Sequence, residues 1–274
     1  MKVSRTNTAV AAGLVAVLLG GSALAIFGYV REPRRTSALR GVRVAEKLGC
    51  FACHGPGGTG GVPNPGSEEQ EVPAWIGGTA MMYVKSEPEI REWILYGRPK
   101  RLQHELSEGS KDSSMARPTR EDLRDQPPRL PLQMPAFDSI VRGKKLDDLI
   151  AFYKAVAVYD TIPTEAHDGY RVASRLGCFG CHGPGGRIGS SNPRSFKGYI
   201  PPWQGADFSD LVKKDDELRQ WILKGKIDRF DSNRLACFFT RRQLIRMPSY
   251  RNALSDEELE ALITYVRWLQ NQES

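Results

Sequence analysis

The sequence predicts an all-α chain in which two copies of one small helical domain follow an N-terminal apolar helix. Three observations predict this fold. Residues 9–30 contain no charge, a segment that begins at residue 41 recurs at residue 169, and each copy alternates short helical patterns with loops rich in Gly and Pro. The expected parts are an N-terminal membrane anchor or signal peptide (1–30), a tether (31–40), a first domain (41–157), a linker (158–168) and a second domain (169–274).

The N-terminal segment has the features of a membrane anchor or of a secretory signal. Lys2 and Arg5 precede an uncharged run of 22 residues. As a helix this run would span about 33 Å, which is enough for the apolar core of a bilayer. Ala23-Leu24-Ala25 fits a cleavage site, so removal as a signal peptide stays open. The apolar run continues past that site to Val30, which favours an uncleaved anchor.

The charge distribution indicates a membrane and argues against nucleic acid as a partner. Of the net charge of +7, the first 40 residues carry +5, whereas residues 41–157 are neutral and residues 158–274 carry +2. Basic residues beside an apolar run orient a membrane segment. The excess positive charge is therefore explained without a nucleic-acid site.

An internal repeat organises the rest of the chain. The copies align at an offset of 128 residues as far as residue 97, and at an offset of 113 afterwards, because the first copy carries 15 additional residues. The aligned segments are Gly41–Cys50 with Gly169–Cys178, Glu89–Gly97 with Glu217–Gly225, and Met134-Pro135 with Met247-Pro248. This pattern indicates a tandem duplication of one domain.

Each copy is expected to contain three helices. A short amphipathic helix runs into the first cysteine of the copy. The middle helix of the first copy, Pro88–Tyr96, has proline at its start and Gly97 after its end, as helix termini commonly do. The closing helices are Lys145–Val156 and Ser255–Gln270, and the second of these begins with a Ser-x-x-Glu capping box. Lys100–Gln133 is rich in charge and Pro and is expected to be a surface loop.

The most specific signal in each copy is the motif C-x-x-C-H. It occupies Cys50, Cys53 and His54 in the first copy, and Cys178, Cys181 and His182 in the second. This motif is the attachment sequence of c-type haem, in which the thiols add to the two vinyl groups of the porphyrin and the histidine binds the iron. A redox dithiol would not explain the repeated histidine, and a shared zinc ion would need cysteine pairs that lie closer together. The sequence therefore predicts two covalently bound haem c groups.

Each copy resembles a class I, mitochondrial-type cytochrome c domain, and the whole chain resembles a membrane-anchored dihaem cytochrome c. The resemblance rests on C-x-x-C-H near the start, Trp-Ile-Leu-x-Gly at a helix end, a late Met-Pro, and an aromatic residue in the last helix. It implies that the first and last helices of each copy cross and that the late methionine is the second axial ligand. The implied ligand sets are Cys50, Cys53, His54 and Met134 for one haem, and Cys178, Cys181, His182 and Met247 for the other.

Alternatives stay open around the first haem. The longer loop of the first copy contains Met115 and His104, either of which could replace Met134 as the axial ligand. The Met81-Met82 pair has no counterpart in the second copy and is expected to pack in the core. Trp93, like its counterpart in the second copy, could donate its indole N–H to a haem propionate or could pack as an aromatic core residue.

The resemblance implies an electron-transfer protein rather than an enzyme. The chain would pass single electrons on the periplasmic face of the cytoplasmic membrane, between a quinol-oxidising complex and an acceptor. It would act as a tethered carrier or as a subunit of a respiratory or photosynthetic complex, with the membrane, a terminal oxidase or similar complex, and small redox proteins as partners. The alternative is an enzyme similar to a dihaem peroxidase, with one haem open to peroxide. The insertion in the first copy leaves room for this alternative.

Overall fold

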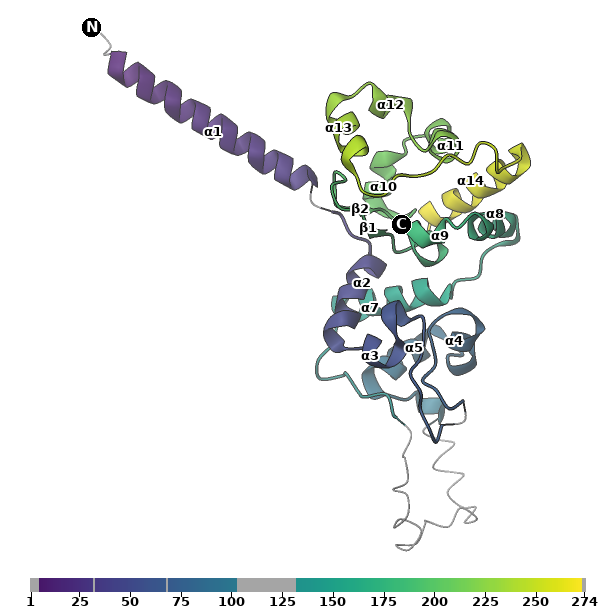
Figure 1. The fold of residues 1–274 in the computed structure, drawn as a ribbon. Coiled ribbons are helices and arrows are strands. Elements are labelled where there is room, and N and C mark those ends of the chain that lie inside the picture. The colour runs from purple at the N-terminus through teal and green to yellow at the C-terminus, as the bar shows by residue number, and fades with distance from the viewer. Residues whose placement is uncertain (1–4, 32, 68, 103–131, 273–274) are drawn as a thin grey trace, which may run out of the picture. The chain divides into compact units, whose positions relative to one another are not determined.

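The computed structural model describes residues 5–31, 33–67, 69–102 and 132–272, with the side chains of residues 5–16 left out. The described chain is mostly helical, which confirms the predicted all-α class (Figure 1). From the N-terminus to the end of the first copy, the helices are α1 (Arg5–Arg31), α2 (Ser37–Leu48), α3 (Phe51–His54), η1 (Pro56–Gly58), α4 (Gly77–Tyr83), α5 (Glu87–Tyr96) and α7 (Lys144–Ala157).

The second copy repeats this order and adds short elements. Its helices and strands are α8 (Thr164–Arg175), α9 (Phe179–His182), η2 (Pro184–Gly186), β1 (Ser190–Ser191), β2 (Tyr199–Ile200), α10 (Gly205–Leu211), α11 (Asp215–Lys224), α12 (Asp228–Asp231), α13 (Arg234–Arg242) and α14 (Asp256–Gln270). The strands β1 and β2 pair to form the small sheet of this copy. The first helix of each copy begins before the predicted domain boundary, at Ser37 and at Thr164.

The described chain forms two compact units. Unit 1 comprises Met1–Arg34, Ser191–Ile200 and Val212–Ala253, and unit 2 comprises Arg35–Ser190, Pro201–Leu211 and Leu254–Ser274. Unit 2 contains the first copy together with the opening and closing helices of the second copy. This division differs from the predicted boundaries, so the predicted domains stay predictions.

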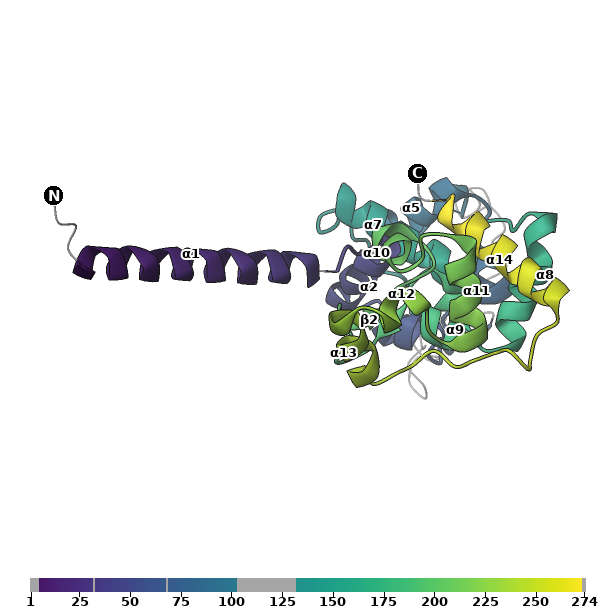
Figure 2. The same cartoon turned by 90° about the horizontal axis from the view of Figure 1, so that it is seen from above.

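The opening and closing helices of each copy pack against one another within unit 2. Helix α2 lies against α7, and α8 lies against α14 (Figures 1 and 2). A Cβ atom at Gly41 would lie 2.0 Å from the carbonyl oxygen of Asp148, and one at Gly169 would lie 2.0 Å from that of Ala261. Both contacts are closer than any Cβ atom can approach, so each helix pair needs glycine at this point. The packing of the two helices agrees with the crossing that the resemblance implies.

The closing helices supply the core of both copies. Their buried apolar residues recur at i, i+3, i+4 and i+7, which places them on one helix face. The matching residues are Leu149, Phe152, Tyr153 and Val156 in α7, and Leu262, Tyr265, Val266 and Leu269 in α14. Burying each of these side chains stabilises the fold by about 1.5–3 kcal/mol. The residues that match at the offset of 113 in the two closing helices are therefore residues of the hydrophobic core.

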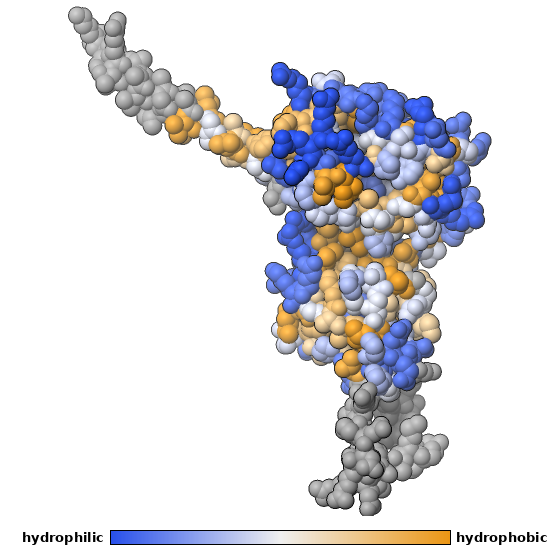
Figure 3. Space-filling model, in the orientation of Figure 1, coloured by the Kyte–Doolittle hydropathy of each residue, from blue (hydrophilic) through white to orange (hydrophobic). Residues whose placement is uncertain are grey.

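Helix α1 forms where the sequence predicts an N-terminal helix. Its described side chains include the exposed apolar residues Leu18, Leu19 and Ile26, and this part of α1 is orange in Figure 3. In the described part of the chain, no helix combines the length and the apolar character needed to cross a membrane. The anchor predicted for residues 1–30 lies partly outside the described residues, which omit residues 1–4 and the side chains of residues 5–16.

Candidate haem sites

Each C-x-x-C-H motif forms one helical turn directly after the opening helix of its copy. The backbone N–H of the motif histidine donates to the carbonyl oxygen of the first motif cysteine, at 3.0 Å in both copies. Gly49 and Gly177 join the opening helix to this turn with φ angles of +74° and +73°, a conformation that glycine adopts at no steric cost. Both thiols and the imidazole of a copy therefore come from a single turn, as covalent attachment of haem c requires.

The motif histidines are oriented by backbone carbonyl groups. Nδ1 of His54 lies 2.8 Å from the carbonyl oxygen of Pro73, and Nδ1 of His182 lies 3.0 Å from that of Pro201. A carbonyl oxygen only accepts, so Nδ1 carries the proton and donates it, which leaves the lone pair of Nε2 for a metal. Burial lowers the pKa of His54 and lowers the pKa of His182 to about 4. Both imidazoles are therefore neutral at pH 7, the form that binds iron.

A tryptophan packs beside each motif histidine. The ring centroids of Trp75 and the first motif histidine lie 4.8 Å apart, and those of Trp203 and the second lie 5.0 Å apart. Each tryptophan makes an edge contact with the closing helix, to Phe152 at 5.8 Å and to Tyr265 at 6.0 Å. These contacts restrict rotation of the imidazole.

The first copy encloses a cavity of about 610 Å³. Its lining includes all the predicted ligands of the first haem, namely Cys50, Cys53, His54 and Met134. Apolar side chains such as Trp75, Ile94 and Leu149 line the rest of it. The volume lies in the range of cofactor pockets, and the donor set of two thiols, a neutral imidazole and a thioether fits a c-type haem. The rival ligands His104 and Met115 lie outside the described residues.

The two Met-Pro loops have the same local structure. A Cβ atom at Gly97 would lie 2.2 Å from the carbonyl oxygen of Met134, and one at Gly225 would lie 2.2 Å from that of Met247. Both glycines adopt the left-handed conformation at the end of a helix, with φ angles of +68° and +69°. The methionine backbone thus rests on the end of α5 in unit 2 and on the end of α11 in unit 1.

The structure brings together the four predicted ligands of the first haem, whereas those predicted for the second are divided between the two units. The second motif turn lies in unit 2, whereas Met247 lies in unit 1. The pairing of Met247 with His182 therefore stays a prediction.

Sequence reasoning missed one pair of residues next to these loops. The side chains of Asn64 and Asn192 are buried and each hydrogen-bonds the backbone of the residue two positions before the predicted methionine ligand, Leu132 and Ile245 respectively. Each asparagine is followed by proline, and the two Asn-Pro pairs stand at the repeat offset of 128. The repeated Asn-Pro dipeptide is the feature of the sequence from which a shared role of the two asparagines could have been predicted.

Two expectations about other side chains can be compared with the structure. The indole N–H of Trp93 donates to the backbone carbonyl oxygen of Tyr83 at 3.2 Å, so this donor has a partner within the protein. The expectation that Met81 and Met82 pack in the core is wrong, because their side chains are 48% and 58% exposed. Both lie in α4, a short helix whose outer face they occupy.

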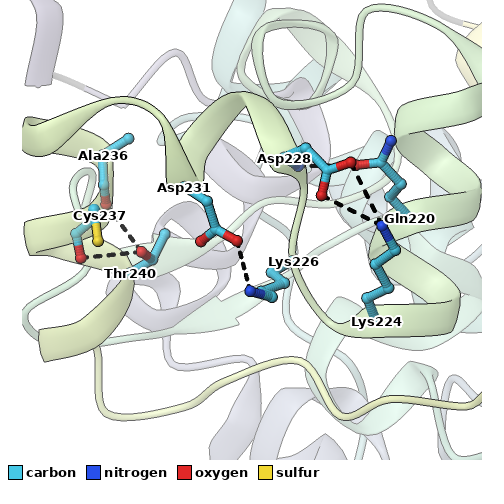
Figure 4. A network of polar contacts seen from close by, with 8 residues as sticks. All are labelled: Gln220, Lys224, Lys226, Asp228, Asp231, Ala236, Cys237 and Thr240. Carbon is cyan, nitrogen blue, oxygen red and sulfur yellow. Dashed lines mark hydrogen bonds and ion pairs between the residues drawn. The ribbon is translucent and has the colours of Figure 1, made fainter.

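Polar contacts in unit 1 hold the segment between α11 and the second Met-Pro loop (Figure 4). Lys226 pairs with Asp231 at 2.5 Å, and Asp228 accepts from Lys224 and donates its backbone N–H to Gln220. The hydroxyl of Thr240 donates to backbone carbonyl oxygens one turn earlier in α13, including that of Cys237. These contacts join α12 to α11 and to the segment between them, and add side-chain hydrogen bonds within α13.

A comparison with protein families finds the second copy similar to a family of cytochrome subunits. The family model for cytochrome C oxidase, cbb3-type, subunit III matches residues 164–266, which include the second C-x-x-C-H motif and Met247. No curated protein matches the chain, and no solved structure does. The match supports a c-type cytochrome, and a domain of this kind implies covalently bound haem c and haem-based electron transfer.

Proposed function

We propose that this chain is a dihaem c-type cytochrome that transfers single electrons and carries no catalytic site of its own. Its haems would be held covalently by the two cysteine pairs. His54 and Met134 would bind the first iron, and His182 and Met247 would bind the second.

The repeated geometry of the motif histidines carries this proposal. In both copies Nδ1 donates to a proline carbonyl oxygen 19 residues further along the chain, and a tryptophan two residues beyond that proline packs on the ring. The second copy lies in the region that matches the cytochrome family. A first copy with the same thiols, the same imidazole orientation and the same aromatic neighbour supports a second haem of the same kind.

The residues around the first cavity suit electron transfer. When bound, the haem iron supplies a one-electron couple between Fe(III) and Fe(II). The Pro73 carbonyl orients His54 and makes it more basic. The thioether of Met134 is a soft, neutral donor that favours Fe(II), and the apolar lining disfavours the additional charge of Fe(III). His54 and Met134 would hold the iron, and all three features would tune its potential.

We infer that the protein works at the outer, periplasmic face of the cytoplasmic membrane, between a quinol-oxidising complex and an acceptor. Two observations support this. The apolar sequence of residues 9–30 fits an anchor or an export signal, and the matching family is named for a subunit of a membrane oxidase. A tether would raise the effective concentration of the haems near such a complex without any additional contact. The protein would then be a tethered carrier or a subunit of that complex.

A haem count and an optical redox titration of the purified full chain test the proposal. We expect two covalently bound haems per chain and two high, similar potentials, because both irons would have the same ligands. One haem per chain would contradict the dihaem proposal. A high-spin ferric haem with peroxide turnover would instead identify the peroxidase-like enzyme.

A further inference from the structure

A buried asparagine bridges two distant segments in each copy. Asn64 accepts from the backbone N–H of Leu132 at 2.6 Å and donates to the carbonyl oxygen of the same residue at 3.3 Å. Asn192 makes the same two bonds with Ile245, both at 2.9 Å. The two asparagines are 5% and 2% exposed. We call this pair of hydrogen bonds the asparagine clamp. The clamp occurs in both copies, although the segment between the asparagine and its partner is 15 residues longer in the first copy.

The side-chain amide suits this bond pattern. It offers a donor and an acceptor side by side, so it can pair with both the N–H and the C=O of one backbone residue. Leucine and isoleucine at the clamped position show that the backbone is what the asparagine binds. The clamped peptide groups cannot rotate without leaving the polar atoms of a buried asparagine side chain unpaired, which is costly.

The clamp residues are themselves held in place by their own loops. The backbone N–H of Asn64 donates to Gln70 at 2.8 Å, and its carbonyl oxygen accepts from the hydroxyl of Ser67 at 2.8 Å. In unit 1, Asn192 donates to Gly198 at 2.9 Å and accepts from the hydroxyl of Ser195 at 2.8 Å. The backbone of each asparagine is thus held by its own loop, and its side chain attaches the segment that leads to the methionine.

The clamp stands at one end of each Met-Pro loop, and a second attachment stands at the other end. Leu132 lies two residues before Met134, and the N–H of Phe137, three residues after it, donates to the carbonyl oxygens of Ile94 and Leu95 at the end of α5. In unit 1 the N–H of Tyr250 donates to Ile222 in α11 at 3.0 Å. The methionine lies between two attachments in both copies.

In the first copy the clamp also connects the two sides of the cavity. The N–H of Val62 donates to the carbonyl oxygen of Cys53 at 3.1 Å, and Asn64 follows two residues later. Asn64, Leu132 and Met134 all line the cavity that His54 lines. A short chain of bonds therefore runs from the covalent attachment turn to the methionine loop.

We propose that Asn64 and Asn192 are positioning residues that hold the methionine loops in the ligating arrangement. This inference rests on the proposed ligand roles of Met134 and Met247. Without the clamp, the loop keeps one attachment and opens more often, so the iron of that copy becomes accessible to added ligands.

Asn64→Ala and Asn192→Ala in the full chain with both haems attached test the inference. Loss of two ordinary hydrogen bonds favours the open loop by about thirty-fold, so imidazole should bind the ferric haem of the altered copy about thirty-fold more tightly. The weak far-red band that marks sulfur ligation of ferric haem should fade, and the potential of that haem should fall. The unaltered copy serves as an internal reference in each variant.

Three further variants separate the possible outcomes. Asn64→Asp keeps the acceptor for Leu132 and should restore part of the clamp, with imidazole affinity between those of the wild type and Asn64→Ala. Thr59→Ala removes only a local bond to Pro56 and should leave the affinity unchanged. Met134→Ala removes the proposed ligand itself. Hydrogen exchange at the Leu132 amide reports directly on the clamp and does not depend on the haem.

The outcomes distinguish the inference from the proposed function. If Met134→Ala opens the first haem but Asn64→Ala does not, the ligand assignment stands and the positioning role is wrong. If neither variant changes the spectrum, Met134 is not the ligand, and the proposed ligand set fails. Faster exchange at Leu132 with an unchanged imidazole affinity would show a clamp that stabilises the loop without positioning the methionine, and would also overturn the inference.

Discussion

The glycines that end α5 and α11 determine where the methionine backbone can lie. Gly97 and Gly225 have positive φ angles, and any side chain on either residue would meet a methionine carbonyl oxygen at 2.2 Å. Two separate requirements therefore coincide, since the helix needs a left-handed residue to end and the loop needs the space that a side chain would fill. Few positions in a chain are restricted in both ways.

Gly97→Ala should destabilise the first copy and displace Met134. The left-handed conformation alone costs alanine about 1–2 kcal/mol, and displacement of the loop should add about 1–3 kcal/mol. Gly49→Ala is the matched control, because Gly49 also has a positive φ angle but has open space where the Cβ atom would lie. Thermal unfolding and the far-red sulfur band measure the two effects. Equal losses of stability in the two variants, with the band intact in both, would show that the close approach is unimportant.

Single residues can be predicted from the sequence where their chemistry forms a local motif, and cannot where it depends on a distant partner. The C-x-x-C-H motif and the late Met-Pro can be read from the sequence alone, and the structure places both on the lining of one cavity in the first copy. Asn64 was not predicted, because its partner lies 68 residues away and an asparagine in a polar loop is usually a turn residue. Met81 and Met82 were predicted to be buried, but nothing in the sequence indicates that α4 has an open outer face.

At the scale of elements, the middle helix of each copy begins with the same carboxylate arrangement. In α11 the side chain of Glu217 accepts from Nε of Arg229 at 2.6 Å and from the backbone N–H of Lys213 at 2.8 Å. In α5 Glu89 accepts from Arg101 at 3.0 Å and from Lys85 at 2.9 Å. The carboxylate satisfies a backbone donor ahead of the helix and joins the two ends of the helix through the arginine.

Glu217→Gln should lower the stability of the protein by about 1–3 kcal/mol at pH 7, the usual value for a hydrogen bond between charged groups. The hydrogen bond from Arg229 lowers the pKa of Glu217 in the folded state. Its contribution is therefore complete above the usual carboxyl pKa and disappears as the pH falls through the lowered value. Denaturant unfolding of wild type and variant across this range should show the difference in stability narrowing as the pH falls.

Two further variants check the cause of this pH dependence. Glu89→Gln should reproduce the pattern in the first copy, since burial and partners are alike. Glu165→Gln alters an exposed carboxylate at the start of α8 and should change little at any pH. A difference for Glu217→Gln that stays constant from neutral to acidic pH would contradict the ionic explanation.

Elements with strong local signals were predicted closely. The middle helix expected at Pro88–Tyr96 is α5 (Glu87–Tyr96), and the closing helix of the second copy begins with the expected capping box, in which Ser255 is the N-cap and Glu258 lies in the first turn. The short helices α4, α10 and α13 were not predicted. Helices of seven to nine residues are marginal on their own, and their formation depends on tertiary contacts that no local pattern reveals.

At the scale of the whole molecule, a chain of charges joins the two copies within unit 2. Lys154 of α7 pairs with Glu87 at 2.9 Å and with Asp160 at 3.0 Å, and Asp160 pairs with Arg187 at 3.2 Å. The guanidinium group of Arg187 also lies over the ring of Trp268 in α14, at 5.5 Å. Asp160 lies in the predicted linker, and its two ion pairs connect the closing helix of the first copy to the loop after the second motif.

The sequence could not predict this connection. Pairing of Asp160 with Arg187 depends on how the two copies pack against one another. Alignment of the copies shows which residues they share, but it does not show which residues of one copy contact the other. The first copy has Thr59 at the position of Arg187, so alignment of the copies marks the arginine as different but does not reveal its partner. Helix α8 begins at Thr164, after Pro163 and within the segment that the sequence predicts as the linker (158–168).

Asp160→Asn should therefore weaken the connection between the copies as well as the overall stability. The side chain of Arg187 is only 9% exposed, and a buried charge that loses its partner costs about 3–5 kcal/mol. We expect a smaller loss, about 2 kcal/mol, because Asp160 itself is 31% exposed and water can replace part of the interaction. Calorimetry of the full chain should show the main unfolding transition moved to lower temperature and broadened as the copies separate.

Arg187→Thr provides the decisive comparison, because it places the residue of the first copy in the second and removes the buried charge together with its need for a partner. Its loss of stability should be smaller than that of Asp160→Asn, and in the double variant the two losses should add only in part, since the two residues share one ion pair while Asp160 also pairs with Lys154. Asp138→Asn, at an exposed carboxylate outside this network, should leave the transition unchanged. Fully additive losses in the double variant would show that Asp160 and Arg187 stabilise the protein independently, and would contradict a connection through their ion pair.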